Sequence, residues 1–216
     1  MLAGNHFVPS AEAAFIAGVT QQQMNRVADE QLVPECLLAK EDGKRRFARI
    51  TAAWAMFFFE SDALLVASAR KRILAELTER ASRSESSDSL FGLHGISKDV
   101  DWTISDPRIG FHLDFTVFLN EALSRAQQVD AAEELVARSD EVMGGKPCFK
   151  GTRLPIEMAL VSLEKGIPEN RVLDEYSLTK EQLNAALVYA QVHPQRGRPV
   201  RLGAGAGAGN SASASH

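Results

Sequence analysis

Apolar residues recur at helical spacing through most of this chain, and the sequence therefore predicts a mainly α fold with short β elements between the helices. The first helix is expected over residues 10–17, with Ser10 as its N-cap and Gly18 as its C-cap. A second helix begins at Thr20, because Thr20 and Gln23 have the spacing of a capping box. Two short helices joined by a tight turn are the pattern of a helix-turn-helix.

The second helix has an apolar face and a polar face. Met24, Val27 and Ala28 recur at helical spacing and are expected to point inward. The polar side chains that remain on the outward face are Gln21, Gln22, Asn25 and Arg26. A helix of this size fits the major groove of DNA, so these four residues are candidates for contact with DNA.

A basic β-hairpin is predicted after the second helix. Its strands are expected at residues 36–38 and 46–48, around a turn at 41–43. Four cations stand within six residues of this hairpin: Lys44, Arg45, Arg46 and Arg49. Such a hairpin suits contact with phosphate or with the minor groove, and together with the two helices it predicts a winged helix-turn-helix. The alternative is a solvated turn without a ligand.

Residues 51–80 are predicted to continue as helix. Trp54, Phe57, Phe58 and Leu65 give this stretch more apolar surface than one face of a small domain needs. These side chains either pack in the core or form a dimer interface, which a palindromic DNA site requires. A homodimer is therefore expected, with core packing as the alternative for these residues.

The middle of the chain is less strongly patterned. Residues 82–89 are polar and unpatterned, and are the best candidate for a linker. Residues 111–117 alternate apolar and polar positions as a half-buried strand does, although a helix that starts at Thr116 is an alternative. Helical spacing returns over residues 120–138.

The C-terminal region is expected to form a three-helix bundle. Pro155 and Pro168 each open a helical pattern, and Thr179 with Gln182 forms a second capping box before the last helix, which Pro194 ends. The chain thus divides into a winged helix-turn-helix with a following helix (1–80), a linker and connecting region (81–139), a three-helix domain (140–195) and a disordered tail (196–216).

A loop rich in glycine and cations precedes this bundle. Its candidate binding residues are Gly145, Lys146, Pro147, Lys150, Gly151, Thr152 and Arg153. Glycine permits backbone angles that other residues resist, so the loop is expected to be compact. Its exposed donors either bind phosphate or acidic side chains, or the loop folds back on the bundle and is tied there by Thr152 and Arg153.

The distribution of charge, the two cysteines and the length of the longest apolar run indicate which classes of protein are compatible with this chain. Residues 84–139 carry four Lys and Arg against ten Asp and Glu, whereas both ends of the chain are close to neutral and are left free to meet phosphate. Cys36 and Cys148 lie far apart and are expected to be reduced thiols of a cytoplasmic protein. The longest apolar run, residues 52–59, is too short to cross a membrane.

No catalytic constellation is evident. The five histidines are scattered without metal-ligand spacing, and residues 144–146 lack the spacing of a phosphate-binding P-loop. Asp99, Asp101 and Asp106 lie close together, but a cluster of acids in a loop is usually exposed to solvent. The protein is therefore expected not to be an enzyme, and to use neither a cofactor nor a metal.

The N-terminal segment resembles the DNA-binding head of MerR-type regulators. Arg45-Arg46-Phe47 stands where that family has its basic, aromatic wing motif. The chain departs from the family because no long coiled coil with a ligand-sensing end follows.

The segment from about Arg138 to Pro194 resembles a domain-of-unknown-function family found in VapB-like antitoxins. The residues that carry the resemblance are Gly145-Lys146-Pro147, Lys150-Gly151-Thr152-Arg153, Pro155, Gly166, Leu178-Thr179 and residues 185–190. Members of that family are usually encoded beside a PIN-like ribonuclease toxin. The resemblance therefore implies an antitoxin whose partners are a cognate PIN-like ribonuclease and operator double-stranded DNA. The alternative is a stand-alone transcription regulator without a toxin.

Overall fold

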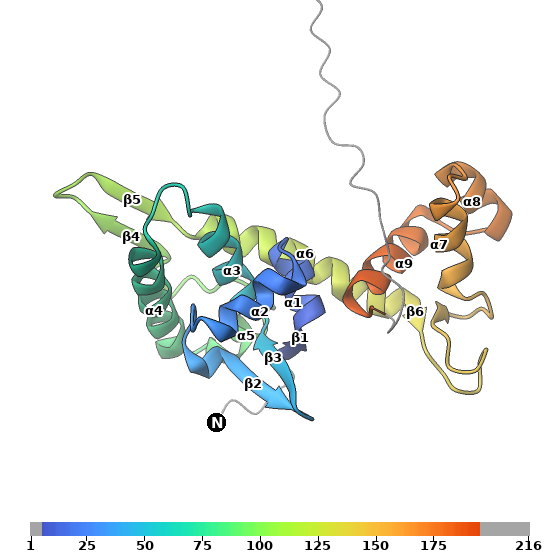
Figure 1. The fold of residues 1–216 in the computed structure, drawn as a ribbon, viewed down its shortest axis with the longest axis horizontal. Coiled ribbons are helices and arrows are strands. Elements are labelled where there is room, and N and C mark those ends of the chain that lie inside the picture. The colour runs from blue at the N-terminus through green and yellow to red at the C-terminus, as the bar shows by residue number, and fades with distance from the viewer. Residues whose placement is uncertain (1–5, 195–216) are drawn as a thin grey trace, which may run out of the picture.

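The computed structural model describes residues 6–194, so the tail predicted at 196–216 lies outside the described residues. The described chain is mainly helical with short strands, as predicted (Figure 1). Its first half contains β1 (Phe7–Pro9), α1 (Ser10–Ala17), α2 (Gln21–Asp29), a 3-10 turn (Glu35–Leu37), β2 (Leu38–Glu41), β3 (Lys44–Ala48), α3 (Thr51–Glu60), α4 (Ala67–Arg83) and α5 (Ser87–Phe91). The remainder contains β4 (Thr103–Asp106), β5 (Phe111–Asp114), α6 (Thr116–Leu135), β6 (Val136–Ala137), β7 (Cys148–Phe149), α7 (Ile156–Glu164), α8 (Glu169–Tyr176) and α9 (Lys180–Val192).

The two predicted short helices are present, with one change at the first cap. Gly18 has a left-handed backbone, with φ of 63°, and ends α1 as expected. The capping box between Thr20 and Gln23 is also present. The N-cap of α1 is Pro9 rather than Ser10, which is the first residue of the helix. The hydroxyl of Ser10 instead accepts a hydrogen bond from Gln21 Nε2 at 2.8 Å and joins α1 to α2.

The predicted hairpin is confirmed, and it belongs to a three-stranded sheet of order β1-β3-β2. Its strands reach further toward the turn than the sequence indicated, and the turn itself is Asp42-Gly43, both at positive φ. Two left-handed residues in succession match the right-handed twist of the flanking strands. β1 was not predicted. It pairs antiparallel with β3, with Phe7 opposite Ala48, so the basic strand β3 lies in the centre of the sheet.

The aromatic residues of α3 pack in the core of the single chain. Trp54, Phe57 and Phe58 are at most 5% exposed. Trp54 Nε1 donates a hydrogen bond to Thr78 Oγ1 at 2.7 Å, and the rings of Trp54 and Phe57 meet Phe115 edge to face. Of the two interpretations of these three side chains, core packing is the one observed, and they are not available as a dimer interface.

The N-terminal unit extends well beyond residue 80. α4 ends at Arg83 and α5 begins at Ser87, so most of the predicted linker at 82–89 is helical. One hydrophobic core contains residues from Val8 to Val129 together with Val192, and Leu90 and Phe91 are buried in it. These two apolar side chains anchor the serine-rich stretch to the core, which its composition alone did not indicate. The 81–139 region is therefore mostly part of the first unit.

The strand predicted at 111–117 is shorter in the structure. β5 ends at Asp114 and pairs with β4, and α6 begins at Thr116. Asp114 Oδ1 accepts a hydrogen bond from the backbone N–H of Thr116 at 2.9 Å, which satisfies one of the first donors of the helix. The strand and the helix that starts at Thr116 are thus both present, one after the other.

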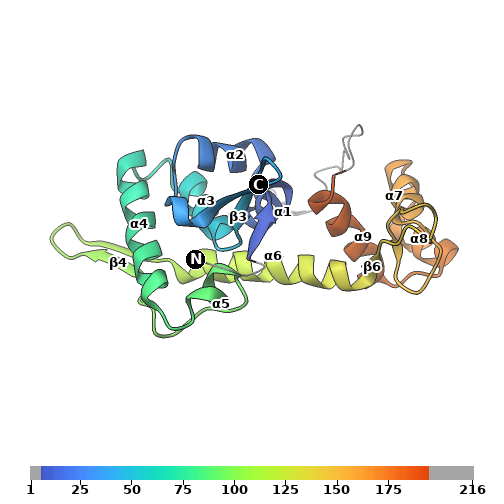
Figure 2. The same ribbon diagram turned by 90° about the horizontal axis from the view of Figure 1, so that it is seen from below.

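The long helix α6 runs beneath the N-terminal unit and on to the C-terminal unit (Figures 1 and 2). β6, β7 and helices α7 to α9 surround a second, smaller core, as the predicted three-helix domain requires. α9 joins the two units, because Leu183 and Ala186 lie in the second core and Val192 lies in the first. No helix among residues 6–194 is long and apolar enough to span a membrane.

Candidate nucleic-acid interface

The outward face of α2 is fixed by the burial of its opposite face. Met24 and Val27 are fully buried, as the helical spacing predicted. The capping box holds the start of the helix: Thr20 Oγ1 accepts from the Gln23 backbone N–H at 3.1 Å, and Gln23 Oε1 accepts from the Thr20 N–H at 2.9 Å. Gln21, Gln22 and Arg26 are consequently exposed, and Asn25 is half-buried.

A groove lies between α2 and β3 and gathers most of the predicted DNA-binding residues. It has a volume of about 480 Å³. Five of its lining residues are candidates from the sequence: Gln21, Asn25, Lys44, Arg45 and Arg46. The rest of the lining comes from residues 9–11 and from Val192 and Pro194 at the end of α9. Residues about 20 positions apart in the chain therefore share one surface, which presents amides on one side and cations on the other.

The arginines of this surface are held by exposed carboxylates. Arg46 pairs with Glu41 at 2.7 Å, and Arg45 pairs with Asp29 and donates to the backbone oxygen of Asn25 at 3.4 Å. Ion pairs exposed to solvent contribute little free energy, so an incoming phosphate exchanges for such a carboxylate at low cost. Lys44 has no ion-pair partner among the described residues.

Arg26 lies on the outward face of α2 and does not line the groove. Its guanidinium pairs with Glu30 at 2.8 Å and lies 5.8 Å from the centre of the Phe59 ring. The hydrogen bond from Arg26 lowers the pKa of Glu30, so this carboxylate remains ionised near neutral pH. Arg26 is thus pre-oriented at the C-terminal end of α2.

Arg49 was predicted to bind DNA, but in the structure its side chain is largely buried and lies outside the groove. Its side chain is 9% exposed and pairs with Glu12 of α1 at 2.8 Å and with Asp130 of α6 at 2.7 Å. Arg49 follows β3 and points away from the end of the hairpin into the interior, where it ties three elements together. The number of cations in the hairpin could not distinguish Arg49 from Lys44. Whether each side chain is buried depends on how β3 packs against the rest of the fold.

Two further cations belong to the same face and were not predicted. Lys40 on β2 lies opposite Arg45 in the register of the hairpin and is exposed. Lys71 of α4 donates from Nζ to the backbone oxygen of Glu30 at 2.8 Å, at the end of α2. Lys40 lies outside the two predicted strands, and the longer pairing of β2 with β3 places it opposite Arg45. Lys71 comes close only through tertiary packing.

The loop at residues 145–153 is compact, and hydrogen bonds within it and to Arg138 hold its backbone. Gly145 has φ of 78°, and a Cβ there would lie 2.8 Å from Asp140 Oδ1. Arg138 Nε donates to the Gly145 oxygen at 2.6 Å. Thr152 Oγ1 donates to the Phe149 oxygen at 2.8 Å and accepts from the Leu154 N–H at 3.1 Å.

The cations of this loop differ in how they are held. Lys146 lies 3.6 Å from Glu157, and Pro147 is buried. Lys150 and Arg153 flank Gly151, whose φ is 78°, and both side chains are exposed. Within residues 6–194 neither Lys150 nor Arg153 has an ion pair. Thr152 therefore ties the loop down, while Arg153 stays available at the surface.

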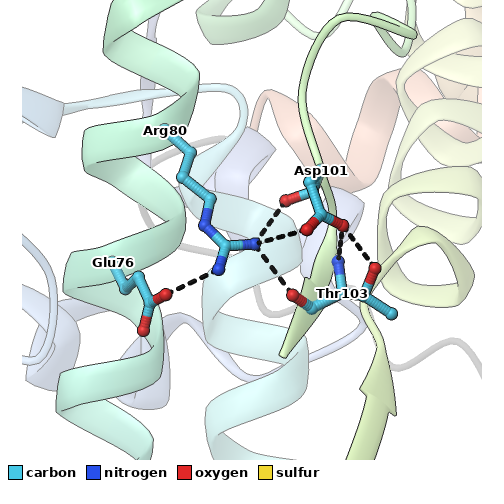
Figure 3. Close-up of polar contacts among 4 residues, drawn as sticks. All are labelled: Glu76, Arg80, Asp101 and Thr103. Carbon is cyan, nitrogen blue, oxygen red and sulfur yellow. Dashed lines mark hydrogen bonds and ion pairs between the residues drawn. The ribbon is translucent and has the colours of Figure 1, made fainter. Parts of the chain in front are cut away.

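Two of the three clustered aspartates, Asp101 and Asp106, are held by contacts within the fold. Arg80 of α4 donates to the backbone oxygens of Asp101 and Thr103, at 2.7 and 2.8 Å, and to Glu76, which pins the start of β4 to α4 (Figure 3). Hydrogen bonds from Thr103 lower the pKa of Asp101, and a hydrogen bond from Arg108 lowers that of Asp106. A general acid needs the opposite shift.

Metal-ligating side chains do not gather in a large cluster. Among residues 6–194 there is no group of three or more His, Cys, Asp and Glu placed to hold an ion.

Comparison with known proteins gives a family match to the C-terminal unit and two matches over most of the chain. Residues 136–190 match the family described as "Protein of unknown function (DUF433)". This segment coincides with the second core. The chain is also 29% identical over 190 residues to "Uncharacterized protein y4eO" from Sinorhizobium fredii, an alignment that covers 88% of this chain and 82% of that protein. A solved structure, "X-ray crystal structure of Rv2018 from Mycobacterium tuberculosis", shares 19% identity with a TM-score of 0.35 and covers 83% of this chain and 96% of its own.

Proposed function

We propose that this protein is a DNA-binding regulator whose N-terminal unit is a winged helix-turn-helix. The observation that carries the proposal is the groove between α2 and β3, which Gln21, Asn25, Lys44, Arg45 and Arg46 line together. Exposed amides on a short helix suit the edges of bases, because Asn and Gln form paired hydrogen bonds with adenine in the major groove. Cations on an adjacent hairpin suit the phosphates.

We propose further that the regulator is the antitoxin of a toxin-antitoxin pair and acts in the cytoplasm. The C-terminal unit supports this, because residues 138–194 resemble a domain found in VapB-like antitoxins. Lys150 and Arg153 offer exposed positive charge, and a PIN-like ribonuclease holds its metal with clustered carboxylates. The loop around Gly151 then docks on that acidic site. Repression of the shared operon by a homodimer completes the proposal.

Binding of promoter DNA tests the first part of the proposal. Fluorescence anisotropy of the full chain with a duplex from upstream of its own operon is expected to show tighter binding than with a random duplex of equal length. The measurement is repeated from low to physiological salt, since the phosphate contribution weakens as salt rises. Equal affinity for both duplexes would remove sequence-specific regulation, and no binding even at low salt would remove DNA binding altogether.

Charge reversal in the loop tests the antitoxin part. Lys150→Glu/Arg153→Glu is expected to weaken co-purification with the neighbouring gene product at least tenfold, because like charges then face one another. Lys165→Glu/Arg171→Glu is the matched control, as both residues are exposed in the same unit. If the promoter is bound but no operon product co-purifies with the unaltered chain, the protein is a stand-alone regulator. If both charge-reversal variants bind equally well, the toxin docks elsewhere.

A further inference from the structure

Two histidines that are 88 positions apart in the sequence meet beside the N-terminal sheet. His6 lies directly before β1, and His94 lies in the turn after α5. The centres of their rings are 5.9 Å apart, and the ring planes are inclined by 63°. Neither residue belongs to the proposed DNA surface or to the loop at 145–153.

One nitrogen of this pair has no partner. His6 Nδ1 is buried and makes no hydrogen bond. A histidine that serves only to fill space normally satisfies a buried ring nitrogen, because leaving a polar atom unpaired costs about 1–3 kcal/mol. The orphaned nitrogen is therefore an observation that packing alone does not explain.

Gly92 keeps the space between the two rings open. A Cβ on this residue would lie 2.6 Å from His6 Nδ1 and 2.6 Å from His94 Nε2. The backbone of Gly92 is right-handed helical, with φ of −76°, so its conformation does not require glycine. What requires glycine is the approach of two imidazole nitrogens to one point.

We propose that His6 Nδ1 and His94 Nε2 together bind one divalent transition-metal ion of the kind that prefers imidazole, namely Cu²⁺, Ni²⁺ or Zn²⁺. Two imidazoles on one tetrahedral ion, with metal–nitrogen distances of about 2.0–2.1 Å, have ring centres roughly 5 Å apart. The observed separation of 5.9 Å is slightly larger, so the proposed site requires the two rings to move closer together. His94 is exposed, which gives its ring room for this movement.

The chemistry of the pair selects the class of metal. Mg²⁺ and Ca²⁺ prefer oxygen ligands, whereas neutral imidazole suits copper, nickel and zinc. No third His, Cys, Asp or Glu joins the pair in the part of the chain that the structure describes, and water completes the coordination. An exchangeable ion is therefore expected, rather than a closed structural site with four protein ligands.

The ion would connect two segments on either side of the junction between β3 and α3. The backbone oxygen of His6 accepts from the Arg49 N–H at 3.0 Å, and that of Phe91 accepts from the Ile50 N–H at 3.1 Å. Because an ion that binds only the folded chain stabilises it by mass action, metal should raise the midpoint of thermal unfolding.

Metal titration of the full chain without an affinity tag tests the proposal. Isothermal titration with ZnCl₂ and NiCl₂ is expected to show one ion per chain. His94→Gln and, separately, Gly92→Ala are each expected to weaken this binding at least tenfold. The electron paramagnetic resonance spectrum of the chain with one equivalent of Cu²⁺ should show hyperfine coupling to two imidazole nitrogens, and His94→Gln should reduce this to one.

His112→Gln serves as the control, because His112 is exposed on β5 away from the pair. It should leave the affinity and the copper spectrum unchanged. Circular dichroism and urea unfolding verify that the Gly92→Ala chain is folded, and the exposed His94 gives a second test that does not alter the backbone. Absence of binding at one ion per chain, or binding that both His94→Gln and Gly92→Ala leave unchanged, would overturn the proposal.

Discussion

A Lys44→Ala/Arg45→Ala/Arg46→Ala variant is expected to lose about two to three units from the slope of log affinity for DNA against log salt concentration, because each phosphate contact contributes roughly 0.9. The three side chains line one groove with the amides of Gln21 and Asn25. Their ion pairs with Asp29 and Glu41 are exposed, so phosphates can replace these carboxylates. Affinity should fall for promoter and random duplexes alike, since phosphate contacts carry little sequence information.

A second triple variant separates this local effect from a change in overall charge. Arg83→Ala/Lys98→Ala/Arg108→Ala removes the same number of charges from exposed positions outside the groove. Its salt slope should match that of the unaltered chain. If the two triple variants change the slope equally, binding depends only on net charge, and the assignment of the hairpin as a DNA-binding wing is wrong.

Replacement of Arg49 by alanine is expected to lower the free energy of unfolding by about 3–5 kcal/mol, which is the usual cost of removing one partner from a buried ion pair. Glu12 is 4% exposed, and Arg49 is its ion-pair partner. Without Arg49 the carboxylate of Glu12 remains in the core without a counter-charge. Urea unfolding followed by tryptophan fluorescence measures the loss, since Trp54 lies in the same core.

The stability of Arg49→Ala should depend on pH differently from that of the original chain. Burial raises the pKa of Glu12 above its ordinary value of 4.5, although the charge of Arg49 acts to lower it. Between pH 4.5 and the pKa of Glu12 in the folded chain, Glu12 is protonated in the folded chain and ionised in the unfolded chain. The contribution of Glu12 to the free energy of unfolding therefore falls as pH rises through this range. Loss of Arg49 raises that pKa further, so Arg49→Ala should continue to lose stability over a wider range of pH above 4.5.

Two controls identify the cause of the loss. Glu12→Gln/Arg49→Met removes both charges and should recover much of the stability, because a neutral pair needs no counter-charge. Arg45→Ala breaks an exposed ion pair and should change stability little. An Arg49→Ala chain that is as stable as the original but no longer binds DNA would show that Arg49 is a DNA contact after all.

The contrast between Lys44 and Arg49 shows how far sequence reasoning reached at the candidate site. Both residues belong to the same basic stretch, and the local sequence pattern predicts contact with DNA equally for each. Lys44 begins the central strand at the turn and meets solvent, whereas Arg49 leaves that strand at the core and meets Glu12 and Asp130. Asp130 is 81 positions further along the chain, so only the packing of α6 could reveal this partner.

The extent of the first unit was missed for a related reason. Residues 82–89 are polar, and a short polar stretch without apolar periodicity predicts a linker. Both ends of this stretch are nevertheless helical, because α4 ends at Arg83 and α5 begins at Ser87. Leu90 and Phe91 at the end of α5 are buried in the core. Two large apolar side chains immediately after a polar segment are sufficient to hold it against the core, because burial of apolar area outweighs the weak preferences of exposed serines.

The sequence by itself determined the features that depend on neighbours in the chain. These are the capping boxes at Thr20 and Thr179, the left-handed turn at Gly18, the hairpin, and the helical face of α2 that carries Gln21 and Asn25. Each follows from backbone hydrogen bonding or from helical periodicity, which act over three or four residues. Only the tertiary structure decided that Arg49 is an interior ion-pair partner, that α9 joins two cores, and that His6 meets His94 beside Gly92. These contacts join distant positions, and which positions meet depends on how whole helices pack together, a property that no short window of sequence contains.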